Sequence, residues 1–193
     1  MVLRHGSRPE DCADPLLDAT GERQAAAVAQ YFQHQVRPQP GFAAVSAILC
    51  SPFARALQTA GPVARALGVP IRVEWGFCEL LSHNWLHSED PLPGLRARPR
   101  ERLDKLAGQD AIDHEYKTVV EPCYPDVVGR LTPGDARARR KAAQRHREAV
   151  KAALSATDGS VLIVGHGSTH YFVADALCPE AWEHFTSRHT PHC

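Results

Sequence analysis

Four short runs rich in apolar residues stand out along the chain, and each has the length and composition of a buried β-strand. They cover residues 1–3, 44–50, 71–73 and 161–164. Amphipathic segments with apolar residues at helical spacing fill much of the sequence between them. Because strands that alternate with helices form parallel sheets covered on both faces, the pattern predicts a three-layer α/β/α sandwich with a mainly parallel sheet.

The helices between these strands have recognisable start and stop signals. They are expected at residues 19–36, 51–67, 136–156 and 168–177, with further helical character near residues 100–106. Thr20 is the expected N-cap of the first helix, and Ser51 that of the second, with Pro52 at its first helical position. Residues 76–132 are rich in proline, charges and aromatics, and are interpreted as an irregular insertion in one domain that spans residues 1–193.

Composition narrows the classes of partner. The chain has 193 residues, a formal net charge of zero and a 44% hydrophobic fraction, so no global charge favours nucleic acid or an anionic membrane. No apolar run approaches the roughly 20 residues of a membrane helix. The six cysteines are scattered without a C-x-x-C pair, which favours reduced thiols and a cytoplasmic location. We therefore expect no nucleic-acid or membrane partner.

Two histidines directly follow predicted strands. His5 lies in Arg4-His5-Gly6, and His166 lies between two glycines at the end of the last apolar run. Since the carboxyl ends of parallel strands meet at one edge of a sheet, both histidines are expected at a shared site. Arg4 and Arg8 beside His5 suit an anion such as phosphate, and their charge would keep His5 neutral.

A third element points to the same edge. The run Ser51-Pro52-Phe53-Ala54-Arg55 follows a predicted strand and begins a predicted helix, whose N-terminal amides favour an anion. Arg55 would lie about one turn into that helix. Taken alone it could be a surface arginine of an amphipathic helix, but its neighbours favour a place in the anion site.

The motifs occur in a familiar order. Arg4-His5-Gly6, then Leu17-Asp18-x-x-Gly21-x-x-Gln24-Ala25, then Ser51-Pro52-x-x-Arg55-x-x-Gln58-Thr59-Ala60, and finally Gly165-His166-Gly167 resemble those of the histidine phosphatase superfamily, in its phosphoglycerate-mutase-like branch. The resemblance implies a phosphoglycerate-mutase-like fold. It also implies a phosphohistidine mechanism, in which His5 attacks phosphorus while Arg4, Arg55 and His166 bind the phosphoryl oxygens.

A carboxyl group after the third strand is the general acid in this branch. Glu79 fits that place, and Glu74, in or just after the strand, is the competitor. A carboxyl group beside a phosphate dianion would hold its proton at neutral pH, as an acid catalyst must. Ser7 followed by Arg8 is also similar to the suppressor-of-T-cell-receptor-signalling proteins and the ecdysteroid phosphate phosphatases, which makes Arg8 a further phosphate ligand.

Hydrolysis is the expected reaction. Phosphoglycerate mutases carry a long acidic-aromatic motif around the acid, and Glu79-Leu80-Leu81-Ser82-His83-Asn84-Trp85 does not resemble it. A mutase and a non-catalytic module that binds a phosphorylated ligand remain alternatives. The substrate, a phosphorylated small molecule or a phosphoprotein, stays open among phosphotyrosine proteins, sugar phosphates and steroid phosphates, and a homodimer stays open too. Aromatic residues of the irregular region are candidates for the pocket wall: Trp75, Phe77, Trp85 and Tyr116.

Other histidines have the spacing of metal ligands. His83 and His87 are four apart, and His189, His192 and Cys193 cluster at the chain end. Neither group has a sensibly spaced third or fourth ligand, so solvated side chains are the favoured interpretation. We expect no metal and no cofactor.

Overall fold

The computed structural model describes residues 1–35, 43–81, 86, 89–124 and 136–178, and its centre is a four-stranded parallel sheet. The strands are β1 (Val2–Arg4), β2 (Val45–Cys50), β3 (Ile71–Val73) and β4 (Ser160–Gly165), in the order β1-β4-β2-β3. Every pairing between them is parallel, so their carboxyl ends lie at one edge. The mainly parallel sheet predicted from the sequence is confirmed.

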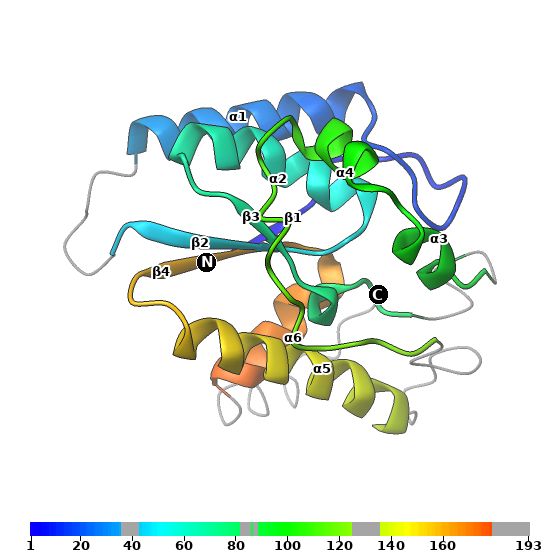
Figure 1. The fold of residues 1–193 in the computed structure, drawn as a ribbon. Helices are drawn as coiled ribbons and strands as arrows, with labels where there is room; N and C mark the ends of the chain where they lie inside the picture. The colour runs from blue at the N-terminus through cyan, green and yellow to red at the C-terminus, as the bar shows by residue number, and fades with distance from the viewer. Residues whose placement is uncertain (36–42, 82–85, 87–88, 125–135, 179–193) are drawn as a thin grey trace.

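Helices cover both faces of this sheet. On one face lie α1 (Ala19–Gln35), α2 (Ala54–Leu67) and α4 (Arg100–Ala107), and on the other lie α5 (Ala136–Ser155) and α6 (Gly167–Leu177) (Figure 1). Two short elements, the 3₁₀ turn η1 (Trp75–Phe77) and α3 (Leu92–Arg96), follow β3. The three-layer α/β/α sandwich is therefore confirmed.

Alternation along the inner strands divides the core between the two faces. Ile48 of β2 and Leu162 of β4 pack with buried residues of α2, whereas Leu49 and Ile163 pack with those of α5. Successive side chains of a strand point to opposite faces, so a strand buried on both faces must be apolar throughout. This requirement explains why the inner strands read as uninterrupted apolar runs.

The predicted N-cap of α1 is wrong. The helix begins at Ala19, and the Oδ1 of Asp18 accepts a hydrogen bond from the backbone N–H of Gly21 at 2.8 Å. Thr20 therefore lies inside the helix. An aspartate is as good a cap as threonine, and the pattern alone could not choose between them.

The predicted start of α2 is also wrong. The helix begins at Ala54 rather than at Ser51, and Phe53 occupies the N-cap position in an extended conformation. The carboxylate of Asp14, far away in sequence, accepts a hydrogen bond from the N–H of Ala54 at 2.8 Å. The helix ends as expected, since Gly68 adopts the left-handed conformation with φ of 65°.

Residues 76–132 contain η1, α3 and α4, as far as that stretch is described, together with irregular segments. Part of it runs along the outer edge of the sheet, where Ile112 forms an isolated parallel bridge with Ile71 of β3. None of the helices in the described part of the chain is long and apolar enough to cross a membrane.

Candidate active site

Three strands end side by side and present polar residues at the same edge. Directly after β1, β2 and β4 come His5, Ser51 and His166. The N–H of His5 donates to the carbonyl of Gly165 at 2.9 Å, so the strand ladder continues through the histidine and fixes its backbone. The two imidazole rings meet edge to face, with centroids 5.2 Å apart. The structure thus brings the two predicted histidines together.

His5 is neutral and has a defined tautomer. Its Nδ1 lies 2.7 Å from the carbonyl oxygen of Gly6, which can only accept, so Nδ1 carries the proton and Nε2 keeps a lone pair. Burial lowers the pKa of His5 to about 4, and the charges of Arg55, Arg4 and Arg8 add to this, against the Gly6 hydrogen bond that raises it. Burial, rather than the arginine charges expected from the sequence, is the largest cause.

The loop after His5 is held by residues of the sequence motifs. The N–H of Ser7 donates to the side chain of Gln24 at 2.8 Å, and its hydroxyl donates to Asp18 at 2.7 Å. The N–H of Leu17 donates to the side chain of Gln58 at 2.9 Å. These polar motif residues fix the path of the loop and do not themselves contact His5.

Glycine is required where this loop meets α1. A Cβ atom on Gly6 would lie 2.7 Å from the carbonyl oxygen of Gly21, and one on Gly21 would lie 2.1 Å from that of Ser7. Such contacts are too short for any side chain. The backbone beside His5 therefore packs directly against the first turn of α1.

Arg55 is a buried cation. Its side chain is 1% exposed, which rules out the surface arginine considered from the sequence. The guanidinium lies 3.6 Å from Asp14, 3.9 Å from Glu79 and 4.5 Å from the centre of the Phe53 ring. Burial lowers its pKa to about 10, which leaves it charged at neutral pH. A buried charge of this kind favours an anion nearby.

Glu79 lies between this arginine and His166. Its Oε1 accepts hydrogen bonds from the hydroxyl of Ser168 at 2.7 Å and from the N–H of Leu80 at 2.9 Å. Its Oε2 lies 3.4 Å from Nδ1 of His166 and 3.9 Å from Arg55. The carboxyl group is 14% exposed, so it can exchange a proton with a bound molecule.

Glu74, the competitor, occupies a different environment. It is fully buried, and its carboxylate accepts four hydrogen bonds. The donors are the N–H groups of Gly76 and Val119 and the hydroxyls of Tyr116 and Thr118. This carboxylate joins the start of its loop to residues 116–119.

His166 is completely buried. Its Nε2 lies 2.8 Å from the hydroxyl of Ser51, and its Nδ1 faces Glu79. Burial, assisted by the charge of Arg55, holds its pKa well below the usual range, so the ring is neutral. The sequence suggested Ser51 as a helix cap, and only the structure shows that its hydroxyl orients this imidazole.

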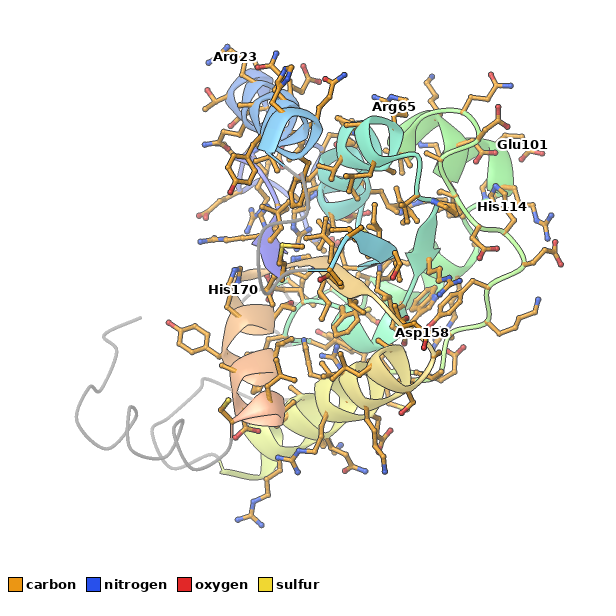
Figure 2. The ribbon with its side chains drawn as sticks, turned by 90° about the vertical axis from the view of Figure 1, so that its left-hand side faces the viewer. Arg23, Arg65, Glu101, His114, Asp158 and His170 are labelled. Atoms are coloured by element: carbon orange, nitrogen blue, oxygen red, sulfur yellow. The ribbon has the colours of Figure 1, made fainter. Side chains whose placement is uncertain are left out.

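Arg4 is exposed and Arg8 is partly exposed. The guanidinium of Arg4 lies close to Gly167, at the start of α6, and that of Arg8 donates to the carbonyl of Pro9 at 2.9 Å. Together with His5 they line an open hollow of about 390 Å³, whose other lining residues are Gly6, Ser7, Glu10 and Gln24. Figure 2 shows Arg23 of α1 above β1 and His170 of α6 below it, on one side of the molecule.

A metal ion is the alternative to an anion as the ligand of this site. His5, Glu79 and His166 offer ligand atoms that all lie within 4.8 Å of one another, a set that suits a transition metal. The guanidinium of Arg55 beside Glu79 opposes a second cation at that point. The charge distribution therefore fits an anion better than a metal. The histidine clusters noted at residues 83–87 and 189–193 lie outside the described residues.

The aromatic wall predicted from the sequence is wrong at Phe77. Phe77 is fully buried in the core against α5, and the hydroxyl of Tyr116 donates to Glu74. Trp75 packs partly buried beneath the guanidinium of Arg96, 5.5 Å from its ring centre. Trp85 lies outside the described residues.

Several residues of the site were not found by sequence reasoning. Asp14 contacts both Arg55 and Arg98, and nothing in its surrounding sequence indicates this. Ser168 supports Glu79, and only its position two residues after His166 could have drawn attention to it. Arg145 reaches the backbone of the Glu79 loop, and the other basic residues around it in α5 leave nothing in the sequence that singles it out.

Comparisons with known proteins agree with this geometry. A family model described as the histidine phosphatase superfamily (branch 1) matches residues 1–193. The sequence has no match among curated proteins.

Three solved structures illustrate the likeness of the fold. The ecdysone phosphate phosphatase of Bombix mori, solved with tungstate, has a TM-score of 0.60 and 20% identity, over 91% of this chain and 75% of its own. A mycobacterial glucosyl-3-phosphoglycerate phosphatase has a TM-score of 0.56 and 21% identity, over 92% and 78%. A phosphoserine phosphatase of Entamoeba histolytica, solved with 3-phosphoglyceric acid, has a TM-score of 0.54 and 18% identity, over 95% and 83%.

Proposed function

This chain belongs to branch 1 of the histidine phosphatase superfamily, and from that membership we propose that it hydrolyses phosphomonoesters through a phosphohistidine intermediate on His5. One observation carries the proposal. His5 is a buried, neutral imidazole whose Nδ1 is engaged by Gly6, which leaves Nε2 free to act as a nucleophile beside the buried charge of Arg55.

In the first step, Nε2 of His5 attacks phosphorus and the ester P–O bond breaks. Arg4, Arg8, Arg55 and His166 bind the phosphoryl oxygens, whose charge spreads in the transition state. Glu79 donates its proton to the leaving oxygen, so the alcohol departs neutral.

In the second step, water replaces the alcohol. Glu79, now a carboxylate, accepts a proton from the water as its oxygen attacks phosphorus. The P–N bond breaks, and its electron pair returns to Nε2 of His5. Inorganic phosphate leaves, and both His5 and Glu79 recover their starting states, so no metal or cofactor takes part.

The substrate class follows the site and its neighbours. The three structural neighbours above are described as phosphatases, which supports hydrolysis over phosphoryl transfer to a second alcohol. The substrate is a phosphorylated small molecule or a phosphoprotein, which would approach Arg4 and Arg8 at the open hollow beside His5. The scattered cysteines remain the basis for a cytoplasmic location.

The test is a nucleophile trap. A radiolabelled phosphomonoester should leave an acid-labile phosphate on the wild-type protein and none on His5→Ala, and phosphate release from p-nitrophenyl phosphate should disappear with it. His114→Ala is the matched control, because this histidine pairs with Asp104 away from the site, and it should label normally. Turnover by folded His5→Ala, or wild-type turnover that EDTA abolishes, would contradict the proposal.

A further inference from the structure

Arg145 of α5 is a buried arginine directed at the backbone of the loop that carries Glu79. The residue is only 4% exposed. One guanidinium nitrogen donates to the carbonyls of Gly76 at 2.8 Å and Cys78 at 3.0 Å, and the other donates to that of Glu79 at 3.3 Å. A single side chain thus bonds three carbonyls within four consecutive residues.

Apolar side chains of the loop are buried in the core, but its backbone has no regular secondary structure. The 3₁₀ turn η1 ends at Phe77, and residues 78–81 have no regular secondary structure, so no ladder fixes them. Carbonyl groups in such a segment need donors from elsewhere, and the planar fork of a guanidinium can serve several at once. A lysine in the same place offers a single nitrogen and could not span them.

The helix and the loop also approach each other closely. A Cβ atom on Gly76 would lie 2.5 Å from the Cβ of Ala149, one turn along α5 from Arg145. Figure 1 shows α5 running beneath the segment that follows β3. The guanidinium therefore lies against the loop in a packed contact and is not a mobile surface charge.

The position of Glu79 depends on its backbone. Its Oε1 accepts from the N–H of its own neighbour, Leu80, and its Oε2 comes within 3.4 Å of His166 only while the loop keeps this path. Glu74 holds the start of the loop through residues 116–119, and Arg145 holds the part that bears the carboxyl group. The two supports meet at Gly76, whose N–H donates to Glu74 and whose carbonyl accepts from Arg145.

We propose that Arg145 is a positioning residue for the general acid, and that it places the carboxyl group of Glu79 by holding the carbonyls of Gly76, Cys78 and Glu79. This rests on the proposed function, in which Glu79 protonates the leaving oxygen. Arg145 touches neither substrate nor phosphate in this role. Its loss should impair proton donation to the leaving oxygen and spare attack by His5 on an ester whose leaving group needs no proton.

Leaving-group dependence separates this role from general damage. An alkyl phosphate needs a proton on its leaving oxygen, whereas 2,4-dinitrophenolate departs without one. Arg145→Lys keeps the charge and loses the fork. It should lower kcat/KM, which reports the steps up to formation of the phosphohistidine, about 10- to 100-fold for the alkyl ester and less than about threefold for the dinitrophenyl ester. Arg145→Gln should do the same where it folds.

Two controls define the result. Arg147 lies on the same helix, is 57% exposed and pairs with Asp175, so Arg147→Gln should leave both rates unchanged. In a Glu79→Gln background, adding Arg145→Lys should cost nothing further with the alkyl ester, because the group that it positions is already gone. Thermal unfolding identifies variants that fail to fold.

Three results would overturn the inference. Equal losses with both esters, additive losses in the double variant, or unfolding of both Arg145 variants would show a purely structural arginine. An unchanged Arg145→Lys would show that only the charge matters. If the wild-type protein hydrolyses neither ester, it is the proposed function that fails, and the labelling of His5 reports that separately.

Discussion

Glu74 and Glu79 belong to one short segment, but their carboxylates differ in burial and in hydrogen-bond donors. Glu74 is fully buried and accepts four hydrogen bonds from amides and hydroxyls that stay in place. Glu79 is partly exposed. Its Oε1 accepts both of its short hydrogen bonds, and its Oε2 faces His166 and Arg55.

The difference supports the proposal that Glu79 is the reactive carboxyl group and Glu74 a structural one. An acceptor whose lone pairs are all satisfied by neutral donors is stabilised as an anion and gains nothing from a proton. An acceptor with one oxygen facing a binding site can take up a proton and give it to a ligand. Burial alone would have favoured Glu74 as the general acid, whereas the arrangement of donors favours Glu79.

Replacing each carboxylate by the corresponding amide should distinguish the two roles most clearly. Glu79→Gln should lower kcat for an alkyl phosphate about 10²- to 10⁴-fold, the usual contribution of a general acid, with little change in thermal stability. Glu74→Gln should leave the activity of the folded protein near normal and lower the free energy of unfolding by about 1–3 kcal/mol, because a buried donor meets an NH₂ group.

Both variants need the same two measurements, steady-state kinetics and urea unfolding. The pair is matched in chemistry and differs only in environment. If Glu74→Gln loses activity while Glu79→Gln stays active, the assignment of the acid is reversed. If both lose stability alone, neither carboxyl group takes part in proton transfer.

Acid should affect the two regions differently. The hydroxyls and amides around Glu74 do not titrate between pH 4 and 7, whereas His5 beside the reactive region does. Its folded pKa of about 4 lies below the unfolded value of about 6.5, so the unfolded chain binds the proton first as the pH falls. Folding should therefore lose about 3 kcal/mol through His5 between pH 6.5 and pH 4, and none above that window.

The measurement is urea unfolding across this range. The wild-type protein should be most stable near neutral pH, and His5→Gln should show a shallower loss on acidification, since its side chain binds no proton in either state. Identical slopes for the two proteins would mean that His5 titrates normally in the folded state. The neutral nucleophile would then lose its main support.

The smallest effect concerns the support of the reactive carboxyl group. Ser168→Ala removes one of the two donors to Oε1 of Glu79 and leaves the N–H of Leu80 in place. We expect kcat for an alkyl phosphate to fall about tenfold, the worth of one hydrogen bond to a charged or polar acceptor. The matched change Thr118→Val, beside Glu74, should alter stability and leave kcat unchanged.

The sequence predicted the parts of the site that follow strands. His5, His166 and Arg55 come directly after apolar runs or within the next helical turn, so a parallel sheet necessarily brings them to one edge. Glu79 came from the resemblance to a family and not from periodicity. The supporting residues Asp14, Arg145 and Ser168 could not be predicted, because their partners lie far away in sequence.

The errors have the same origin. Ser51 has the composition of a helix cap, but its hydroxyl is engaged by a histidine of another strand, and the helix starts later. Phe77 was predicted to line a pocket because aromatic residues often do, and it fills the core instead. Local pattern describes an element well and describes its long-range partner poorly.

The order of the strands has a consequence for how the protein matures. Among the described strands, β1 pairs with β4 alone, and the amino group of Met1 bonds the carbonyl of Val161 across a separation of 160 residues. During synthesis, β1 is therefore made before β4 and can take its place in the sheet only after β4 has emerged. Recovery of catalysis during refolding should report completion of the whole sheet, because contacts of such long range close slowly.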